Sequence, residues 1–519
     1  MEGVLHMRIT NVMMNRGMLN SIMGNKQDMN TKFEQYATGQ KIQKPSDDPV
    51  TAIRSLKYRA DLLETEQYVE KNVRDAQIWM ESTESALKNI DDILTQLYDK
   101  CVAGASDSYE TIDRDSMQLQ LSSMKEEVYN SLNADDAGRY LFSGYRTNTS
   151  VCYTSDDKTK RYTIDEPLSF TSMYEKTYLT GGASYDPTKT AETYKGEAPS
   201  TDKCYCMDLT YTDIKQLNSI KIYGNGRRVE INEKNSTDTD AYETEAGKIT
   251  FLKDTGQLII PDDMYEELRT SQGLVVNYDK DTFAKGDLRP EMYFDCTSWD
   301  LDASGNKIES TKKINRKPQN QQIDYHVNTK QSLTVNVLAN EVMGASFARV
   351  VDDITSAVNS AFSTQEKIEE VDLLLADSNQ SADKIEALET LKEQLNTELT
   401  LKKSILRDTF AKSQTVVKAV QDGENTPERV GGPGATVSVR VSKIGVNIAK
   451  TSIGSRSARL ELIESRLTDL KTSYQTIRES IEGVSLEEAM TNYTSALTAY
   501  NASLNATGRA VQNSLLDFI

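Results

Sequence analysis

The residues that most often carry chemistry are few and scattered in this sequence. Its two histidines, His6 and His326, lie far apart, although His is the side chain whose charge changes nearest neutral pH. The five cysteines form one close pair, Cys204-Tyr-Cys206, which is tighter than the Cys-x2-Cys spacing of a zinc knuckle. We therefore expect free thiols. The alternatives are one adventitious disulfide, or a metal site formed by Cys152, Cys204, Cys206 and Cys296.

Motifs of known catalytic centres are missing from the sequence. It contains no His-Glu-x-x-His, no Gly-x4-Gly-Lys-[Ser/Thr] and no Gly-x-Ser-x-Gly. Gly224-Asn-Gly226 is too short for a dinucleotide-binding loop, and acidic pairs such as Asp47-Asp48 are typical of helix caps and solvated helix faces. The sequence thus predicts a non-enzymatic protein without catalytic, cofactor-binding or metal-binding residues.

Composition excludes several classes of partner. The chain has 519 residues, a formal net charge of −19 and only 37% hydrophobic residues, which favours an elongated, surface-rich body over one large core. The acidic balance argues against nucleic acid and against an anionic membrane surface. No apolar run approaches the roughly 20 residues that span a bilayer, and the first 19 residues offer no continuous apolar segment for a secretory signal.

The strongest helical signal is a heptad stripe in the first third of the chain. Asp48 followed by Pro49 predicts an N-cap and first helical position, and Gly104 predicts a stop, so we expect one long helix over 50–102. Four apolar residues precede the stripe in a shifted phase, at Ile53, Leu56, Ala60 and Leu63. The stripe itself comprises Val73, Ala76, Met80, Thr83, Leu87, Ile90, Leu94, Leu97 and Cys101.

Helical patterns also mark the region near 114–132, the region 340–421 and both chain ends. A second seam runs through Leu460, Ile463, Leu467, Leu470, Tyr474, Ile477, Ile481 and Val484. Ser485-Leu-Glu-Glu488 predicts a capping box that opens a last helix. The sparse terminal stripes are Ile9, Val12, Leu19, Ile22, Met29, Phe33 and Tyr36 at the start, and Met490, Tyr493, Leu497, Tyr500, Leu504, Val511, Leu515, Leu516 and Phe518 at the end.

The middle of the chain has a different character. Most of the tyrosines and prolines lie between 151 and 330. Two hairpins are predicted around Gly-bearing turns, over 220–231 and 249–260, with further strands at 274–278, 291–296 and 332–337. Residues 423–434, which contain Pro427 and Pro433, are expected to be a linker or turn.

The predicted fold is mainly α with a β-rich insert. It is an elongated antiparallel helical bundle, a rod in which the N- and C-terminal helices pair and the β domain is inserted at the far tip. The expected domains are an N-terminal amphipathic helix (1–44), the first half of the rod (45–150), the β-rich outer domain (151–335), the second half of the rod (336–485) and the C-terminal amphipathic helix (486–519).

The terminal stripes indicate assembly. The seams over 73–101 and 460–484 are expected to form an intramolecular core. The terminal stripes are flanked by Asn, Ser and Thr and bury too little apolar area to offset the backbone entropy alone. We expect them to order when neighbouring copies supply the missing surface.

Four blocks of sequence resemble the flagellin family of flagellar axial proteins, and together they lie within roughly 1–150 and 330–519. They are Met7-Arg-Ile-Thr-Asn11, Thr38-Gly-Gln-Lys-Ile-Gln-Lys-Pro-Ser-Asp-Asp-Pro49, Asn133-Ala-Asp-Asp-Ala-Gly-Arg-Tyr-Leu-Phe-Ser-Gly-Tyr145 and Ile453-Gly-Ser-Arg-Ser-Ala-Arg-Leu-Glu461. The finish Ser514-Leu-Leu-Asp-Phe-Ile519 resembles the members at the hook–filament junction rather than the flagellins, which usually end on a more polar tail.

The resemblance implies a structural, non-enzymatic role in the bacterial flagellum. Such proteins leave the cell through the flagellar type III apparatus without a cleaved signal peptide. They form a ring of identical subunits between hook-associated protein 1 and the first flagellin subunits, and an export chaperone usually holds their C-terminal region before assembly. No cofactor, nucleic acid or membrane insertion is implied.

The resemblance also assigns residues to the assembly. It implies that the N-terminal stripe pairs with the C-terminal stripe in an inner tube, through Ile9, Val12, Leu19 and Ile22 on one side and Leu497, Tyr500, Leu504, Val511, Leu515, Leu516 and Phe518 on the other. The connector between tube and rod and the second family motif are expected at Pro45, Ser46, Asp47, Asp48, Pro49, Gly138 and Arg139.

Two alternative functions stay open. A flagellin that builds the filament itself would share the same blocks, apart from the C-terminal finish. The insert could instead act as a surface binding module, because tyrosine-rich hairpins can bind glycans, although nothing in it has catalytic spacing.

Overall fold

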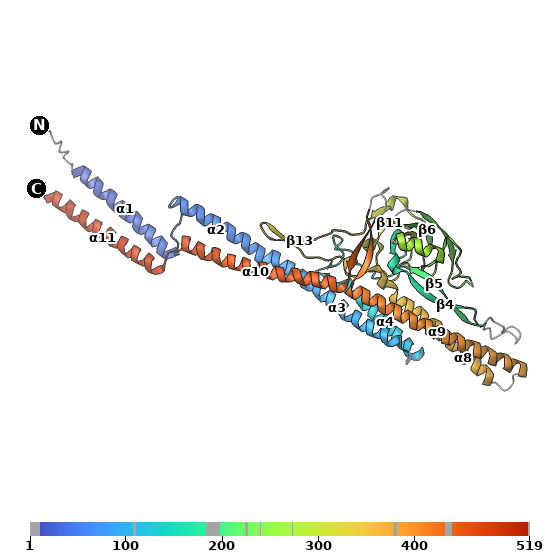
Figure 1. Cartoon of the computed structure of the whole chain (residues 1–519). Helices are drawn as coiled ribbons and strands as arrows, with labels where there is room; N and C mark the ends of the chain where they lie inside the picture. Colours follow the sequence, from blue (N-terminus) through green and yellow to red (C-terminus); the bar gives the residue numbers. More distant parts are fainter. Residues whose placement is uncertain are drawn as a thin grey trace. The chain divides into compact units, whose positions relative to one another are not determined.

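The fold is mainly α-helical with a β-rich insert, as the sequence predicts (Figure 1). It was determined as a computed structural model, which describes residues 11–106, 111–182, 198–223, 227–238, 240–271, 273–376, 381–430 and 438–516. Helices occupy both ends of the chain, and the strands lie mostly between them in sequence.

The N-terminal helices begin and end close to the predicted signals. Asp48 caps α2, since its carboxylate accepts hydrogen bonds from the backbone N–H groups of Val50 and Thr51, and Pro49 occupies the first helical position. Gly104 ends α3. The elements are α1 (Asn11–Thr38), α2 (Pro49–Gln67), the π-helical η1 (Tyr68–Val73), α3 (Arg74–Gly104) and α4 (Thr111–Leu132).

The single helix expected over 50–102 is wrong in one respect. Six residues, Tyr68–Val73, adopt a π-helix between α2 and α3. A π-helix places more residues in each turn than an α-helix, so it rotates the side chains that follow it. The residues after Val73 therefore face a different direction from the one that an uninterrupted α-helix would give them.

The insert forms a sheet that contains ten strands among the described residues. Their order is β12-β11-β3-β10-β6-β7-β8-β9-β5-β4, and the pairs are antiparallel except β7 with β8. The strands are β3 (Lys160–Ser169), β4 (Tyr174–Thr180), β5 (Ser200–Asp208), β6 (Gln216–Ile222), β7 (Arg228–Lys234), β8 (Lys248–Leu252), β9 (Gln257–Ile260), β10 (Gly273–Lys280), β11 (Asp295–Asp300) and β12 (Lys313–Asn315).

Short elements complete this region. They are the hairpin strands β1 (Asp135–Asp136) and β2 (Arg139–Tyr140), the pair β13 (Asp324–Asn328) and β14 (Gln331–Thr334), the short helices η2 (Phe170–Ser172), η4 (Asp262–Met264), α5 (Tyr265–Ser271), α6 (Pro290–Tyr293) and η5 (Glu309–Thr311). Both predicted hairpins are confirmed, as β6–β7 and β8–β9, and so is the strand at 274–278.

Two predicted strands are displaced. The strand expected over 291–296 begins only at Asp295, because Pro290 stands at the first position of the short helix α6. The strand expected over 332–337 is β14, which ends at Thr334. Alternating apolar residues alone did not mark either boundary.

The C-terminal half returns to helices. They are α7 (Ala339–Val342), η6 (Ala345–Arg349), α8 (Val350–Ala376), α9 (Ala382–Asp422), α10 (Val446–Glu482) and α11 (Leu486–Leu516). The prediction of a linker or turn over 423–434 is wrong for the part that the structure describes. There, β15 (Glu424–Val430) pairs antiparallel with β16 (Ser438–Ile444). Pro427 fits there because a two-stranded ribbon leaves one edge of each strand unpaired.

The chain divides into two compact units, each built from distant parts of the sequence. The first contains residues 1–75, 326–332 and 459–519, and the second contains residues 76–325 and 333–458. In the second unit the heptad residues of α3 are buried, and α8 and α9 pack side by side as an antiparallel pair (Figure 1). The intramolecular core predicted for the stripe over 73–101 is therefore confirmed.

A buried group of charges joins the sheet to the helices within the second unit. Lys412 on α9 donates to Asp208 at the end of β5 over 2.6 Å and lies 3.2 Å from Asp353 on α8. Arg349 contacts Asp353 at 3.1 Å. Burial opposes ionisation of Asp208, but Lys412 and Arg349 outweigh it and hold its pKa well below the usual range.

Candidate assembly surface

Helices α1 and α11 form an antiparallel pair within the first unit (Figure 1). Two aromatic contacts set their register, because the ring of Tyr493 lies 5.5 Å from Phe33 and 6.2 Å from Tyr36, centroid to centroid. Among the described side chains of α11, Ala489 and Ala496 are buried. Small side chains at these positions let the helices approach each other, but they bury little apolar area.

Most large apolar side chains of this pair remain exposed. On α1, Leu19 is 52%, Met23 66% and Phe33 51% exposed. On α11, Leu486, Met490 and Leu504 are also exposed. In α3, by contrast, the apolar stripe is almost completely buried. The α1–α11 pair is therefore an incomplete core.

The predicted interface residues fall into three groups. Leu19 and Leu504 are exposed, and Ile22, Leu497 and Tyr500 are half-buried. Because the two helices are antiparallel, residues before Phe33 lie beside residues after Tyr493. Equal numbers of residues counted from this contact bring Ile22 level with Leu504. Val12, Val511, Leu515 and Leu516 belong to the helices but their side chains are not described, and Ile9 and Phe518 lie outside the described residues.

The connector joins α1 to α2 beside the junction of α10 and α11. Asp47 accepts hydrogen bonds from the backbone N–H groups of Gln43 and Lys44, at 3.3 and 2.9 Å. These two bonds, together with the cap formed by Asp48, order the turn that contains Pro45 and Ser46 and ends at Pro49. Hydrogen bonding to the carboxylate, chiefly from Thr51, lowers the pKa of Asp48.

Backbone bonds hold the two helix junctions together. The N–H of Lys41 donates to the carbonyl of Glu482 over 2.7 Å, and the N–H of Val484 donates to the carbonyl of Gly39 over 3.0 Å. Gly39 has φ +69°, and a Cβ at Gly483 would lie 2.6 Å from the carbonyl oxygen of Glu479. The requirement for glycine is local at both positions, whereas the two backbone bonds join segments from opposite ends of the chain.

Side chains reinforce the same crossing. Arg59 on α2 forms a two-pronged contact with the carboxylate of Glu482, at 2.6 and 2.8 Å, and the hydroxyl of Ser55 also donates to this carboxylate. Hydrogen bonding from Arg59 lowers the pKa of Glu482. Further along the pair of helices, Lys471 contacts Glu70 at 2.7 Å.

The outer face of α2 was not recognised in the sequence as a surface. Ile53, Leu56 and Leu63 are 68%, 60% and 66% exposed, and Ala60 on the same stripe is exposed. The residues of α2 that are buried lie on another face and include polar Ser55 and Thr65. The shifted phase before the heptad stripe was the signal that could have revealed this unpartnered face.

The remaining motif residues, Gly138 and Arg139, lie in the second unit, in the hairpin formed by β1 and β2. Gly138 has φ +80° in the β1–β2 turn, and its N–H donates to Asp135 over 2.8 Å. Arg139 contacts Asp136 at 3.1 Å and stacks over the ring of Trp79 at 4.9 Å. Arg139 thus secures the hairpin to α3, and Gly138 supplies the left-handed backbone that the turn requires.

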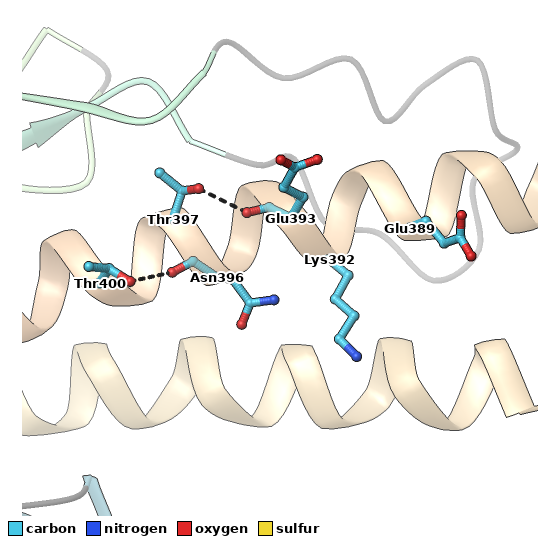
Figure 2. Close-up of a pocket in the computed structure, with 6 residues that line it drawn as sticks. All are labelled: Glu389, Lys392, Glu393, Asn396, Thr397 and Thr400. Atoms are coloured by element: carbon cyan, nitrogen blue, oxygen red, sulfur yellow. Dashed lines mark hydrogen bonds between the residues drawn. The ribbon is translucent and has the colours of Figure 1, made fainter.

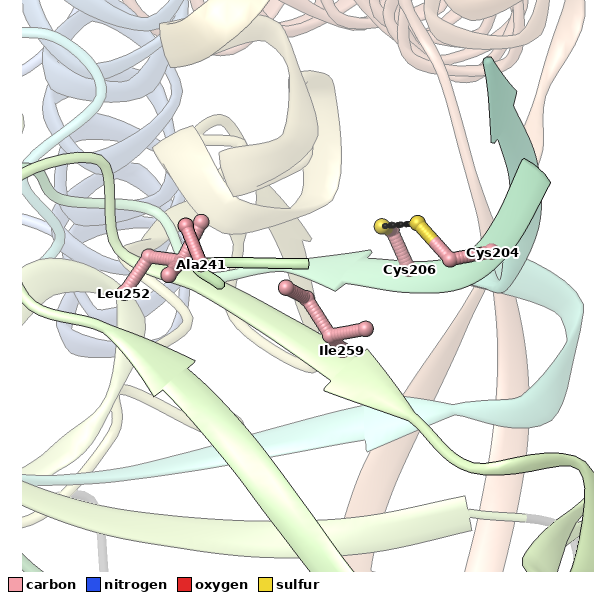
Figure 3. Close-up of a cluster of buried hydrophobic side chains, with 5 residues drawn as sticks. All are labelled: Cys204, Cys206, Ala241, Leu252 and Ile259. Atoms are coloured by element: carbon pink, nitrogen blue, oxygen red, sulfur yellow. Dashed lines mark hydrogen bonds between the residues drawn. The ribbon is translucent and has the colours of Figure 1, made fainter. Parts of the chain in front are cut away.

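The five cysteines and His326 do not gather at one site among the described residues. All five cysteines are buried free thiols, and burial raises the pKa of Cys101 to about 12. Cys204 and Cys206 place their sulfur atoms 3.5 Å apart beside Ala241, Leu252 and Ile259 (Figure 3).

The alternative of a four-cysteine metal site is wrong. Cys204 and Cys206 lie on β5 and Cys296 on β11, near opposite ends of the sheet. Within the part of the chain that the structure describes, no three His, Cys, Asp or Glu side chains gather as metal ligands would. His326 is exposed on β13, and His6 lies outside the described residues.

A shallow hollow of about 390 Å³ lies along α9 (Figure 2). Its lining residues are Glu389, Lys392, Glu393, Asn396, Thr397 and Thr400, all from this one helix. Thr397 and Thr400 bond to backbone carbonyls one turn earlier, so this arrangement offers no convergent set of reactive groups. Among the described residues, no helix is both long and apolar enough to cross a membrane.

Comparison with known proteins points to the flagellum. Residues 9–147 match the family model of the bacterial flagellin N-terminal helical region. Flagellar hook-associated protein 3 of Salmonella typhimurium is 26% identical, and that of Escherichia coli 25%, each over 146 residues. Each match covers 28% of this chain and 45% of the relative, so the chain spans about half the length of these relatives. The resemblance to the flagellin family is thus confirmed over residues 9–147.

The chain also matches solved structures, at low TM-scores. A putative flagellar hook-associated protein from Vibrio parahaemolyticus is 14% identical, with a TM-score of 0.33, and the match covers 84% of this chain and 100% of that chain. The flagellar junction protein FlgL from Legionella pneumophila is 10% identical, with a TM-score of 0.27 and the same coverage of 84% and 100%.

Proposed function

We propose that this chain is a structural subunit of the bacterial flagellum that forms the junction between hook and filament. The observation that carries this proposal is the incomplete core of the α1–α11 pair, which leaves Leu19, Met23 and Phe33 exposed. The match of residues 9–147 to the flagellin N-terminal region supports it, as do the curated relatives named hook-associated protein 3.

The proposed mechanism is coupled ordering and packing. Complete burial of one Leu, Met or Phe side chain is worth about 1.5–3 kcal/mol, so partial burial of several such residues between copies supplies on the order of 5–10 kcal/mol per subunit. This gain offsets the backbone entropy of ordering the terminal helices. The exposed stripe of α2, with Ile53, Leu56 and Leu63, extends the same surface.

The proposed partners follow from this role. The chain packs against copies of itself in a ring, with hook-associated protein 1 on one side and flagellin on the other. Before assembly, an export chaperone covers the apolar residues of the C-terminal region, and the chain leaves the cell through the flagellar type III route. The connector at Pro45–Pro49 joins the inner tube to the rod. The chain has the five domains that the sequence predicts, with the same bounds. Its role is non-enzymatic.

A flagellin that builds the filament itself is the second candidate, because the matching family model is that of the flagellin N-terminal region. Antibody-coupled gold on intact cells that make the chain separates the two. A single deposit where hook meets filament supports the junction role. Label along the whole filament would make the chain a flagellin.

A pair of variants tests the assembly surface. Replacing both Leu19→Gln and Met23→Gln removes apolar contact from α1 without touching the buried alanines of α11. The control is Leu373→Gln on α8, a side chain that is 74% exposed in the second unit. We expect the double variant to be missing from isolated flagella and the control to be present. Equal incorporation of both would contradict the proposed surface.

A further inference from the structure

A hollow of about 530 Å³ lies at one edge of the sheet in the second unit. Its walls come from β3, the edge strand β12 with its neighbour β11, the start of α6 and the loop that follows β2. The volume falls within the range of small-molecule sites in proteins. The hollow is separate from the proposed assembly surface, which lies in the first unit.

The charge of this hollow opposes that of the chain. Four basic residues line it, Arg146, Lys160, Arg289 and Lys313, and the only acidic residue in the described lining is Glu291. The chain as a whole carries a net charge of −19. Converging cations repel one another, and this repulsion is relieved when an anion binds between them.

Among the described residues, three of the four basic side chains, Arg146, Lys160 and Lys313, form no ion pair, and Arg289 has Glu291 at 3.8 Å. Arg289 stacks over the ring of Tyr153 at 4.2 Å, and its Nε donates to Ser150 over 3.3 Å. Arg146 donates to the side-chain oxygen of Asn315 over 3.1 Å. A guanidinium has five N–H groups, so both arginines keep donors for a ligand.

Glu291 supplies a group of the opposite kind. It is buried, and its Oε1 lies 3.8 Å from the guanidinium of Arg289, too far for a hydrogen bond. Its Oε2 is buried and has no hydrogen-bond partner at normal geometry among the described residues, although the hydroxyl of Tyr162 lies close enough to interact with the carboxylate. A buried carboxylate oxygen without a donor is costly, and a ligand hydroxyl would satisfy it.

Anion-binding donors and an unpartnered acceptor in one hollow specify a ligand with both features. We propose that this hollow binds a small acidic sugar, a mono- or disaccharide that carries a phosphate, sulfate or carboxylate group. The four basic residues hold the anionic group, and Glu291 accepts a hydrogen bond from a ring hydroxyl. The side chains of Ser150 and Asn315 line the same hollow and provide further polar contacts.

The test is isothermal titration of the full chain with glucose 6-phosphate, glucose 6-sulfate and glucuronic acid, with glucose and inorganic phosphate as references. We expect at least one acidic sugar to bind tenfold more tightly than glucose and inorganic phosphate. Equal affinity for inorganic phosphate would overturn the sugar assignment, and no binding of any acidic sugar would overturn the site.

Variants locate the binding. Lys313 is exposed on the edge strand, so Lys313→Ala preserves the fold, and we expect it to weaken acidic-sugar binding at least fivefold. The matched control is Lys221→Ala, an exposed lysine on β6 outside the hollow. We expect Glu291→Gln to reduce the preference for the sugar phosphate over inorganic phosphate. Equal affinities in Lys313→Ala and Lys221→Ala would refute the proposed location.

Discussion

Substitution of Gly104 by Ala sets two physical effects against each other. Gly104 is the last residue of α3, and Ala is favoured over Gly in a helix by about 1 kcal/mol. A Cβ at this position would, however, lie 2.5 Å from Cε1 of Phe410 on α9. Phe410 is fully buried, so its ring has no open space into which it can move.

The steric effect is expected to prevail. Overpacking a well-filled core costs about 1–3 kcal/mol, and displacement of a buried aromatic ring belongs at the upper end of that range. The helical gain is also reduced at Gly104, since a helix end leaves part of the propensity unrealised. We therefore predict that Gly104→Ala lowers the free energy of unfolding of the second unit by about 1–2 kcal/mol.

Urea denaturation followed by tryptophan fluorescence measures this effect, because both tryptophans, Trp79 and Trp299, are buried in the second unit. The matched control is Gly454→Ala in α10, where a Cβ would meet nothing within 4 Å. It should raise the free energy of unfolding by about 0.5–1 kcal/mol. If Gly104→Ala is as stable as Gly454→Ala, the close contact with Phe410 does not limit this position.

Two further predictions concern buried charges, and both use the same urea assay. Lys412→Met leaves the carboxylate of Asp208 without its closest partner and should destabilise the second unit by about 3 kcal/mol. Lys418→Met removes a solvent-exposed contact with Asp422 and a distant one, 6.0 Å, with the ring of Tyr98, so it should keep the wild-type midpoint. Equal midpoints in the two variants would contradict this. Burial raises the pKa of Glu166 from 4.5 to about 6, so the folded state favours the protonated carboxyl. Its contribution to the free energy of unfolding is therefore complete below pH 4.5 and is lost as the pH rises through 6. Glu166→Gln should therefore remove about 2 kcal/mol of the change in stability between pH 4.5 and 7, and an unchanged pH profile would show that Glu166 is ionised freely in the folded chain.

The sequence alone determined the features that depend on neighbouring residues. Asp48 and Pro49 predicted the start of α2 because capping and the fixed φ of proline act within one turn. The heptad spacing from Val73 to Cys101 predicted the buried face of the helix since side-chain direction repeats every 3.6 residues. Glycine-bearing turns between alternating segments predicted the hairpins β6–β7 and β8–β9.

The tertiary structure alone decided the features that depend on distant segments. The seam predicted as core over 460–484 is buried at Leu460, Ile463 and Leu467 but only half-buried from Leu470 onward, because burial depends on what packs against a helix and not on its own periodicity. The backbone bonds from Lys41 to Glu482 and from Val484 to Gly39 likewise join segments from opposite ends of the chain.

The cationic hollow shows the same division between local and distant information. Arg146, Lys160, Arg289 and Lys313 are widely separated in sequence, between positions 146 and 313, and come together at the edge of the sheet. Their types are visible in the sequence, but local spacing carries no information about convergence. The order of strands β12-β11-β3 brings them together, and that order is set by long-range hydrogen bonding between strands and by burial of the sheet's apolar face.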